Sequence, residues 1–454
     1  MLDTLKRYLR YTSWPILASV VALMTLGVLA IRASEQADPD MTGFAAKQMA
    51  FAGAGIVVFI AATSFPYARL GRLAYPLFGA TLVLLVAVFY LPDVRGSHRW
   101  IDLKVVRFQP SELAKLTFII LLAWYLRYGD HYRRLGGLII PFLLTLVPMG
   151  LILKEPDLGT ALLFLPTLYF MLFLAGAKLR HLLTIVGLGT LVVLLPVPRG
   201  VDAETFQTQR DGGRFETVQL GPVKLFSVDR SLPWRQQPEV PAAYCRFQIG
   251  EGRVFDLQPL SLRVLKGHQS RRIEGWLRQN DPRIEQGKGY QLSQSKIVLG
   301  AGKLTGRGEW GDADATFRML PDDHTDFIYS VVGGQWGFLG CLFVLALYGV
   351  IFVFGVEIAV LTYDPFGRLL AVGVLALLLS QVVINVGMTM GLMPITGMTL
   401  PLVSYGGSSL VVNCAALGLL VNIGQRRPIL LGRRPFEYGE RGEKPPAPYG
   451  PLAD

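Results

Sequence analysis

Carboxylates gather immediately before a long apolar stretch in the second half of the sequence. The stretch follows directly after four residues that carry or accept charge: Asp322, Asp323, His324 and Asp326. Because charged side chains are costly in hydrocarbon, those at its boundary usually have a function, and a carboxylate there could serve as a general base. The structural alternative is a helix start, with Thr325 as N-cap and Asp326 in the favourable first turn.

The apolar stretch itself is too long for one membrane span. It continues from Asp326 to Leu361, and a single helix of that length would exceed the roughly 30 Å of bilayer hydrocarbon. The sequence therefore predicts a short helix from about Thr325, a break at Gly333 and Gly334, and then the span. This arrangement would hold Asp326 at the outer mouth of a helix bundle.

Two further motifs contribute polar and ionisable side chains at the same predicted depth. The segment "GSHRWIDLKVVRFQPSELAK" contributes Arg99, Arg107, Gln109, Ser111, Glu112 and Lys115, and "LKEPDLGTA" contributes Lys154, Glu155 and Asp157. Cations and carboxylates drawn from distant loops suggest a water-accessible pocket for an anionic substrate. Glu112 and Lys115 are three residues apart, so a structural ion pair on one helix face is the alternative for Lys115.

A third motif, "GLMPITGMTLPLVSYGGSS", combines helix breakers with hydroxyl groups. Pro394, Gly397 and Pro401 prevent a continuous helix, although a simple connection between two helices would explain the first two. Non-helical backbone at membrane depth is tolerated only where it lines a cavity or is buried in protein. We therefore expect this motif, with Ser404, to border the same pocket.

The elements that must position these residues are membrane helices. Hydrophobic residues make up 52% of the 454 residues and charged residues only 17%, which excludes an ordinary water-soluble domain. Stretches of about 20 apolar residues predict an all-α polytopic protein with about ten transmembrane helices, at 14–32, 47–65, 73–91, 112–126, 138–154, 158–176, 181–197, 337–358, 369–391 and 403–423. Some spans are short, so nine or eleven is the alternative; an even number puts both termini on one side.

The predicted helices are joined by loops that lie alternately on the two sides of the membrane, and positive charge is concentrated in the loops of one side. Lys and Arg occupy both ends of the chain and alternate loops, as Lys6, Arg7, Arg10, Arg69, Arg72, Arg127, Arg133, Arg134, Lys178, Arg180, Arg368, Arg426, Arg427, Arg433 and Arg434. The positive-inside rule assigns these connections and both termini to the cytoplasm, and places 33–46, 92–111 and 198–326 outside. The net charge of +11 then reflects topology and anionic lipid, and no nucleic-acid partner is expected.

The sequence divides into four parts. Residues 1–197 hold the first seven transmembrane helices, 198–325 form a large external loop, 326–427 hold the short entry helix and the last three spans, and 428–454 form a cytoplasmic tail rich in Pro, Gly and charge that is expected to be disordered. Within the loop, alternation broken by Gly predicts a small β-rich insertion over 199–265. The three dispersed cysteines suggest neither a disulfide framework nor a metal site.

Four motifs in order resemble the RodA/FtsW family, the shape, elongation, division and sporulation (SEDS) proteins of bacteria. They are "FQPSELAK", "EPDLGTA", "LPDDHTDFIYSVVGGQWGFLG" and "GLMPITGMTLPLVSYGGSS". The resemblance covers about residues 14–197 and 266–427. It implies a peptidoglycan glycosyltransferase of the bacterial cytoplasmic (inner) membrane. Such an enzyme polymerises lipid II, an undecaprenyl-pyrophosphate-linked disaccharide peptide, at the outer face, with inversion and release of undecaprenyl pyrophosphate.

The resemblance also implies roles for the residues singled out above. Asp326 matches the family's essential carboxylate and is the candidate catalytic base. The candidates for substrate binding are Arg99, Lys115 and Arg107 at the pyrophosphate, and Gln109, Ser111, Glu112, Asp157, His324 and Ser404 around it. A divalent cation, Mg²⁺ or Mn²⁺, is compatible with a pyrophosphate substrate, but no ligand cluster requires one. The expected protein partner is a class B penicillin-binding protein, a transpeptidase.

The sequence departs from the family pattern in two respects. Where relatives commonly have acidic residues it has Arg318 and the pair Gly334 and Gln335, which bears on rate or regulation more than on reaction type. A nearby carboxylate, Asp312, Asp322 or Asp323, could replace one of them. The β-rich insertion is also absent from the family pattern, and is either a tolerated surface excursion or a docking surface for the partner.

Other functions fit the same pocket. A lipid II flippase would need ionisable groups near the membrane midplane, whereas those found lie toward one side. A non-catalytic scaffold of the elongation or division machinery is a second alternative, and it predicts that Asp326→Ala retains function. An O-antigen ligase or polymerase takes a similar donor but has different motifs. Thr396, where division-type members tend to have Lys, favours the elongation type.

Overall fold

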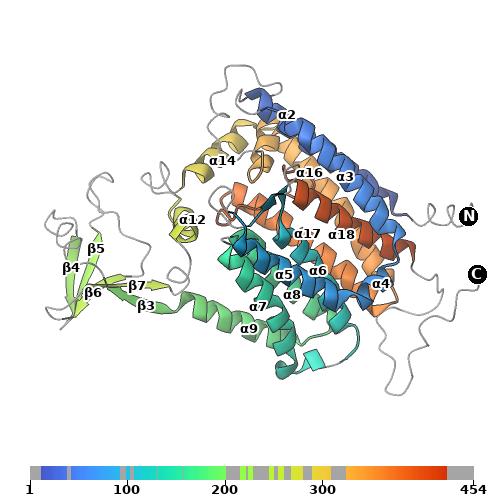
Figure 1. Ribbon diagram of the computed structural model, residues 1–454. Helices are drawn as coiled ribbons and strands as arrows, with labels where there is room; N and C mark the ends of the chain where they lie inside the picture. Colours follow the sequence, from blue (N-terminus) through green and yellow to red (C-terminus); the bar gives the residue numbers. More distant parts are fainter. Residues whose placement is uncertain are drawn as a thin grey trace, which may run out of the picture.

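The chain forms a helical bundle and, set apart from it, a small β-sheet (Figure 1). The computed structural model describes residues 12–37, 42–92, 99–102, 107–129, 131–155, 157–200, 215–220, 223–228, 245–249, 254–259, 267–279, 289–307 and 324–426. Several residues named above lie outside these ranges: Asp312, Arg318, Asp322, Asp323 and the tail 428–454.

Ten apolar helices of the described chain build the bundle. They are α2 (Trp14–Ala37), α3 (Phe44–Ser64), α5 (Ala74–Ala87), α6 (Pro110–Leu126), α7 (Ile139–Lys154), α8 (Leu158–Ala175), α9 (Leu179–Leu194), α16 (Ile328–Leu361), α17 (Pro365–Thr389) and α18 (Gly407–Gln425). Seven are long and apolar enough to cross a membrane, whereas α9, α6 and the stretch formed by α5 and the 3₁₀ helix η1 (Val88–Tyr90) are shorter. Each overlaps one predicted span, which confirms the all-α polytopic fold.

Short elements connect these helices. On the way between spans lie α4 (Tyr67–Arg72), η2 (His131–Arg133), η3 (Leu135–Leu138) and the hairpin of β1 (Ile101–Asp102) and β2 (Arg107–Phe108). The long connection between α9 and α16 carries the β-sheet and two further helices, α12 (Gly267–Leu277) and α14 (Tyr290–Ala301). The hairpin and α14 contact bundle helices, so these connections cover one end of the bundle.

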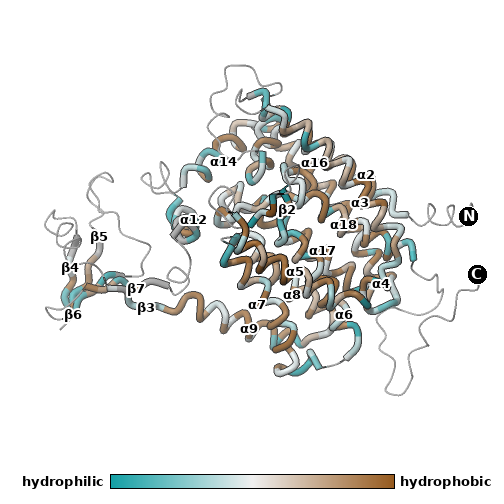
Figure 2. Tube along the Cα trace, viewed as in Figure 1, coloured by the Kyte–Doolittle hydropathy of each residue, from teal (hydrophilic) through white to brown (hydrophobic). Residues whose placement is uncertain are grey.

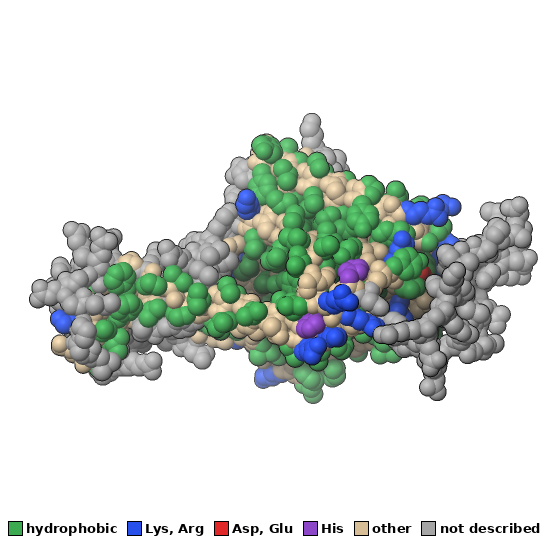
Figure 3. Space-filling model, turned by 90° about the horizontal axis from the view of Figure 1, so that it is seen from below, with side chains coloured by type: hydrophobic (Ala, Val, Ile, Leu, Met, Phe, Trp, Pro, Cys, Tyr) green, Lys and Arg blue, Asp and Glu red, His purple; other side chains and the backbone are tan. Residues whose placement is uncertain are grey.

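The centre of the bundle is formed by α17 and α18. α17 packs against α6, α8 and α16, and α18 packs against α3. The contact of α3 with α18 is close, since a Cβ on Gly418 would lie 2.6 Å from the carbonyl oxygen of Phe59, and small residues permit such approaches in membranes. The bundle helices are hydrophobic along much of their length (Figure 2). The outer helices turn apolar side chains outward, and hydrophobic side chains cover much of the face in Figure 3, as expected for a surface in lipid.

The predicted basic ends of α3 and α18 meet at the end of the bundle where α2 starts. Arg426 Nη2, just after α18, donates to the carbonyl of Ser64 at the end of α3 at 3.0 Å. Gln425 Nε2 donates to the hydroxyl of Thr12, just before α2, at 2.8 Å. Figure 3 shows Lys and Arg side chains gathered toward one end of the bundle. Both ends of the bundle's chain therefore lie on one side, as an even number of spans requires.

The predicted break in the long apolar run lies at a different residue. α16 is helical except at Gly337, where φ is 66° and ψ is −162°. The prediction of a break at Gly333 and Gly334 is therefore wrong, since both of those residues are helical. The span that follows Gly337 agrees with the predicted one.

Tertiary contact explains why the break falls at Gly337. The turn after α14 lies against it, and the two amides that the break releases are satisfied there. Phe338 N–H donates to the carbonyl of Lys303 at 2.8 Å, and Leu339 N–H donates to that of Leu304 at 3.1 Å. Because helix breaks in a membrane must find new partners for freed backbone groups, the partner turn fixes the position of the break.

A five-stranded antiparallel sheet follows α9. Its strands are β3 (Pro196–Gly200), β4 (Phe215–Leu220), β5 (Val223–Val228), β6 (Cys245–Ile249) and β7 (Val254–Pro259), in the order β3-β7-β6-β5-β4. The β-rich insertion is thus present and starts slightly before the predicted residue 199. Arg246 and Asp256, on neighbouring strands, form a buried bidentate pair with nitrogen–oxygen distances of 2.6 and 3.0 Å. The sheet lies away from the bundle at the far end of α9 (Figure 1).

Replacing Gly337 with alanine should destabilise the protein. An L side chain is strained at this positive φ, and its Cβ would lie 2.3 Å from the amide nitrogen of Gly306. We expect a loss of about 1–3 kcal/mol, measured as a lower melting temperature in detergent. Gly349→Ala on the same helix is the matched control, because nothing lies within 4 Å of its Cβ. Equal melting temperatures for the two variants would show that Gly337 is not constrained.

Candidate active site

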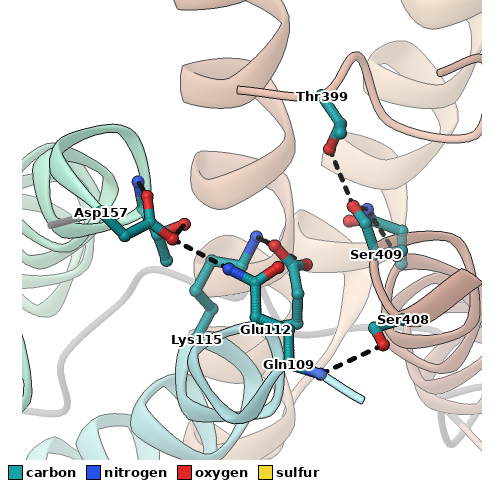
Figure 4. Close-up of polar contacts among 9 residues, drawn as sticks. Gln109, Glu112, Lys115, Asp157, Thr399, Ser408 and Ser409 are labelled. Atoms are coloured by element: carbon teal, nitrogen blue, oxygen red, sulfur yellow. Dashed lines mark hydrogen bonds and ion pairs between the residues drawn. The ribbon is translucent and has the colours of Figure 1, made fainter. Parts of the chain in front are cut away.

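A buried ion pair lies on the first turns of α6. Lys115 Nζ is 2.9 Å from both carboxylate oxygens of Glu112, and both side chains are almost fully buried (Figure 4). Pro110 occupies the start of the helix, where no amide hydrogen is needed. The ion pair that the spacing of three residues predicts is therefore present, and it neutralises the charge of Lys115 in this state.

A second polar contact joins α6 to α8. Gln109 Nε2 donates to Asp157 Oδ2 at 2.9 Å. Asp157 is the N-cap of α8 and accepts from the Thr160 amide at 3.0 Å and from the Thr160 hydroxyl at 2.8 Å, which satisfies donors that a helix start leaves open. Gln109, Glu112, Lys115 and Asp157 together are the α6–α8 cluster (Figure 4).

Ser408, at the start of α18, is bonded to the chain just before α6. Its hydroxyl accepts from the Gln109 amide at 3.2 Å and donates to the Arg107 carbonyl at 2.9 Å. Ser111 is fully buried on α6, and its hydroxyl has no hydrogen-bond partner within the described chain. An unpaired buried hydroxyl is costly, and within these ranges Ser111 lacks the partner that such a group normally has.

Asp326 lies in a turn that precedes α16, not in the first helical turn. The N-cap position of α16 is Phe327, and no side chain caps the helix there, so the predicted cap at Thr325 is wrong. The carbonyls of the turn are held from outside instead. Ser404 Oγ donates to the Thr325 carbonyl at 2.5 Å, and Asn385 Nδ2 donates to the Asp326 carbonyl at 2.9 Å.

His324 and Ser404 both support this turn. The Tyr405 amide donates to the His324 carbonyl at 2.9 Å. The His324 ring packs against the rings of Phe44 and Tyr405, with centroid separations of 4.8 and 5.7 Å. The Ser404 hydroxyl also accepts from the Leu400 amide at 2.8 Å. Both side chains therefore hold the turn and the connection after α17 in place.

The connection between α17 and α18 contacts the Asp326 turn and the start of α8. On one side, Asn385, which binds the Asp326 carbonyl, also donates to the Met398 carbonyl at 2.6 Å. On the other side, a Cβ on Gly159 in the first turn of α8 would lie 2.8 Å from the Thr396 carbonyl oxygen. The first turn of α8 is the one that Asp157 caps. The structure thus gathers Asp326 and the α6–α8 cluster around one connection.

Glu155 is a residue whose role sequence reasoning missed. It follows α7, is fully buried, and both carboxylate oxygens lack a hydrogen-bond partner within the described chain. Burial is the largest cause that raises the pKa of Glu155, the charge of Asp157 adds to it, Arg99 opposes it, and the resulting pKa is about 8. The signal in the sequence was a second carboxylate two positions before Asp157, between two apolar helices.

The two predicted arginines lie at the edge of this region. The Arg107 side chain is half exposed, and its Nε lies 3.9 Å from Asp102 Oδ2 across the β1–β2 hairpin. Arg99 is close enough to Glu155 to oppose the rise in its pKa. In the described ranges, no three His, Cys, Asp or Glu side chains are grouped so that they could hold a metal ion.

These features define a polytopic membrane protein with a polar site at one end of its bundle. Residues 13–211 and 253–428 match the model of a protein family, FtsW/RodA/SpoVE, that is described as "Cell cycle protein". The chain therefore belongs to the RodA/FtsW family. The gap between the matched ranges falls within the β-sheet insertion, so the family model does not include that part.

Individual relatives of two types match most of the chain. Peptidoglycan glycosyltransferase RodA of Treponema pallidum is 32% identical over 423 residues, covering 91% of this chain and 97% of the relative. Probable peptidoglycan glycosyltransferase FtsW of Trichlorobacter lovleyi is 29% identical over 436 residues, covering 93% and 96%. The sequence comparisons thus match elongation and division types at similar identity.

Two solved structures share the fold. Rod shape determining protein RodA of Thermus thermophilus has a TM-score of 0.58 and 27% identity, covering 92% of this chain and 97% of that chain. A chain from a structure described as "Structural coordination of polymerization and crosslinking by a peptidoglycan synthase complex" has a TM-score of 0.64 and 28% identity, covering 91% and 97%.

Breaking the ion pair of α6 from one side should cost more stability than removing both charges. Lys115→Met or Glu112→Gln alone leaves a buried charge unpaired, which costs about 3–5 kcal/mol. The double variant should recover most of that loss. Unfolding in detergent measures all three variants. Single variants within about 1 kcal/mol of wild type would contradict a closed, buried pair.

Glu155 should make stability depend on pH. Its pKa in the folded protein, about 8, lies above the ordinary value of about 4.3, so its protonation favours the folded state. Stability is therefore lost as pH rises between these two values. Glu155→Gln should become more stable relative to wild type from pH 5 to 8, whereas Glu357→Gln, an exposed control on α16, should not. A pH-independent difference would show that Glu155 is ionised throughout.

Proposed function

We propose that this protein polymerises lipid II with Asp326 as the catalytic base, at the outer face of the bacterial cytoplasmic membrane. The chain is a membrane glycosyltransferase of the RodA/FtsW family, whose relatives are named peptidoglycan glycosyltransferases. One observation carries the proposal. The backbone of the Asp326 turn is fixed by Asn385 and Ser404, beside the connection that also contacts the start of α8.

The proposed reaction is a direct displacement at the donor sugar. Asp326 accepts the proton of the acceptor's GlcNAc 4-hydroxyl as that oxygen attacks C1 of the donor MurNAc. The new glycosidic bond forms while the bond from C1 to the pyrophosphate oxygen breaks, and undecaprenyl pyrophosphate leaves with the electron pair. The configuration at C1 inverts. General-base assistance of this kind contributes about 10²- to 10⁴-fold in rate.

The leaving pyrophosphate requires positive charge close to it. Arg107, whose side chain is half exposed, and Arg99 at the same edge are the cations that bind it. Lys115 contributes to the site as part of its ion pair with Glu112, whose net charge is zero. Glu155 holds a proton near pH 7, since its pKa is about 8, and therefore adds little negative charge beside the phosphates.

The remaining polar groups orient the sugars. Gln109 and Asp157 are fixed to each other at 2.9 Å, and the buried Ser111 hydroxyl supplies a further polar contact. His324 and Ser404 act indirectly, because their contacts hold the turn that carries Asp326. No resident cofactor has a role in this proposal.

Orientation follows from charge. The basic end of the bundle is cytoplasmic by the positive-inside rule, which puts the Asp326 end outside. The similarity to a chain from a peptidoglycan synthase complex supports a class B penicillin-binding protein as partner. Thr396 lies buried beside α8. Division-type members tend to have Lys at this position, so Thr396 supports the elongation type.

A transporter accounts less well for the same residues. A flippase needs charged groups along a path through the bilayer, whereas Asp326, Asp157, Glu112 and Lys115 lie at or near helix starts. This asymmetry favours chemistry at one surface over passage across the membrane.

Polymerisation of labelled lipid II by the purified protein, alone and with its class B partner, tests the proposal. Asp326→Asn should reduce the rate by about 10²-fold or more, because an amide cannot accept the hydroxyl proton. Glu357→Gln, which removes an exposed carboxylate far along α16, is the control and should retain the wild-type rate. Melting temperatures confirm folding of each variant.

Each other outcome of this experiment is informative. Equal glycan yields from wild type and Asp326→Asn would support the polymerase activity but exclude Asp326 as its base. No glycan from wild type, even with the partner, would favour the flippase or the scaffold.

A further inference from the structure

α12 and the turn that follows it are anchored by two side chains onto the chain just after α17. Trp276 Nε1 donates to the Gly391 carbonyl at 3.0 Å, and Gln279 Nε2 donates to the same carbonyl at 3.2 Å. Gly391 has a φ of +80°, a left-handed conformation that glycine adopts at little cost. Lys296 of α14 donates to Gln279 Oε1 at 3.3 Å. α12, which follows the β-sheet insertion in sequence, is therefore fixed over the Asp326 end of the bundle.

Anchored in this way, α12 brings Arg272 to the candidate base. A Cβ on Gly397 would lie 2.9 Å from Arg272 Nη1 and 3.3 Å from Asp326 Oδ2. The guanidinium and the carboxylate thus border the same small space, which exists because residue 397 has no side chain. Gly397 has a φ of +73°, so both its conformation and its surroundings favour glycine.

The chemistry of this pair is specific. A guanidinium is always charged, and its planar set of N–H donors matches the two oxygens of a carboxylate. A cation beside a carboxylate favours the ionised form, which a general base requires before it can accept a proton. A guanidinium that borders the same space can also direct the carboxylate, and small errors in the position of a reacting group are costly in rate.

We propose that Arg272 is the positioning residue of Asp326, holding its carboxylate ionised and directed at the acceptor hydroxyl. This inference rests on the proposed function, in which Asp326 is the base. Arg272 acts on the reaction through Asp326, and α12 is the element that delivers it. The docking of α12 through Trp276 is then part of the assembly of the site.

The test is the pH–rate profile of lipid II polymerisation by the full-length protein. Arg272→Ala should lower kcat by about 10- to 100-fold and change KM for lipid II by less than about threefold. The acid limb of its profile should move by about one pH unit or more to higher pH, because a carboxylate without its cation is protonated more easily. Arg272→Lys keeps the charge and should retain the wild-type acid limb.

Controls separate this role from folding. Arg278→Ala, in the turn after α12, should leave the profile unchanged. Gly397→Ala places a Cβ against both side chains and should lower kcat as Arg272→Ala does. Added guanidinium ion should restore part of the rate of Arg272→Ala, which a misfolded protein would not show.

The outcomes also separate this inference from the proposed function. An inactive Asp326→Asn together with an unshifted acid limb in Arg272→Ala would overturn the role of Arg272 alone. A rise in KM with an unchanged profile would overturn it as well, because it would make Arg272 a substrate contact. Full activity of Asp326→Asn would overturn both.

Discussion

Non-helical backbone inside a membrane bundle must find its hydrogen-bond partners within the protein, and the connection between α17 and α18 is where this chain meets that constraint. Side chains from three helices satisfy it: Gln48, Tyr348 and Asn385 donate to the carbonyls of Ser404, Pro401 and Met398. Leu402, a non-glycine residue with a φ of 67°, is held fully buried in this network. Once fixed, the connection supports the Asp326 turn on one side and approaches α8 on the other.

Buried charge near this connection is treated in three different ways. Lys115 and Glu112 neutralise each other. The Asp157 carboxyl group has hydrogen-bond donors, because it caps α8 and accepts from Gln109. Glu155 has neither solution, and burial raises its pKa to about 8, so it is mostly protonated at neutral pH. The site can therefore hold several carboxyl groups beside an anionic substrate without a large excess of negative charge.

Local physical rules account for what the sequence predicted correctly. The ten helices follow from apolar length, and the ion pair follows from spacing on one helix face. The strands of the insertion follow from alternation. The four motifs also contribute described residues to the same end of the bundle, as their predicted depth implied.

Tertiary contacts account for what the sequence could not give. The break at Gly337 depends on the turn after α14, and the Asp326 turn depends on donors from Ser404 and Asn385. Arg272 reaches Gly397 because α12 docks on Gly391, which no periodicity of α12 reveals. The raised pKa of Glu155 could not be predicted either, because it depends on the residues that bury the side chain. In each case the deciding partner lies far away in the sequence.

The central claim is that Asp326 and the polar groups around α6 and α8 form one site for lipid II, and a structure of the protein with bound lipid II tests it most directly. The proposed mechanism predicts the acceptor 4-hydroxyl oxygen at about 2.6–3.2 Å from the Asp326 carboxylate. It also predicts the donor pyrophosphate beside Arg99 and Arg107. Pyrophosphate bound elsewhere, or an acceptor hydroxyl out of reach of Asp326, would contradict it.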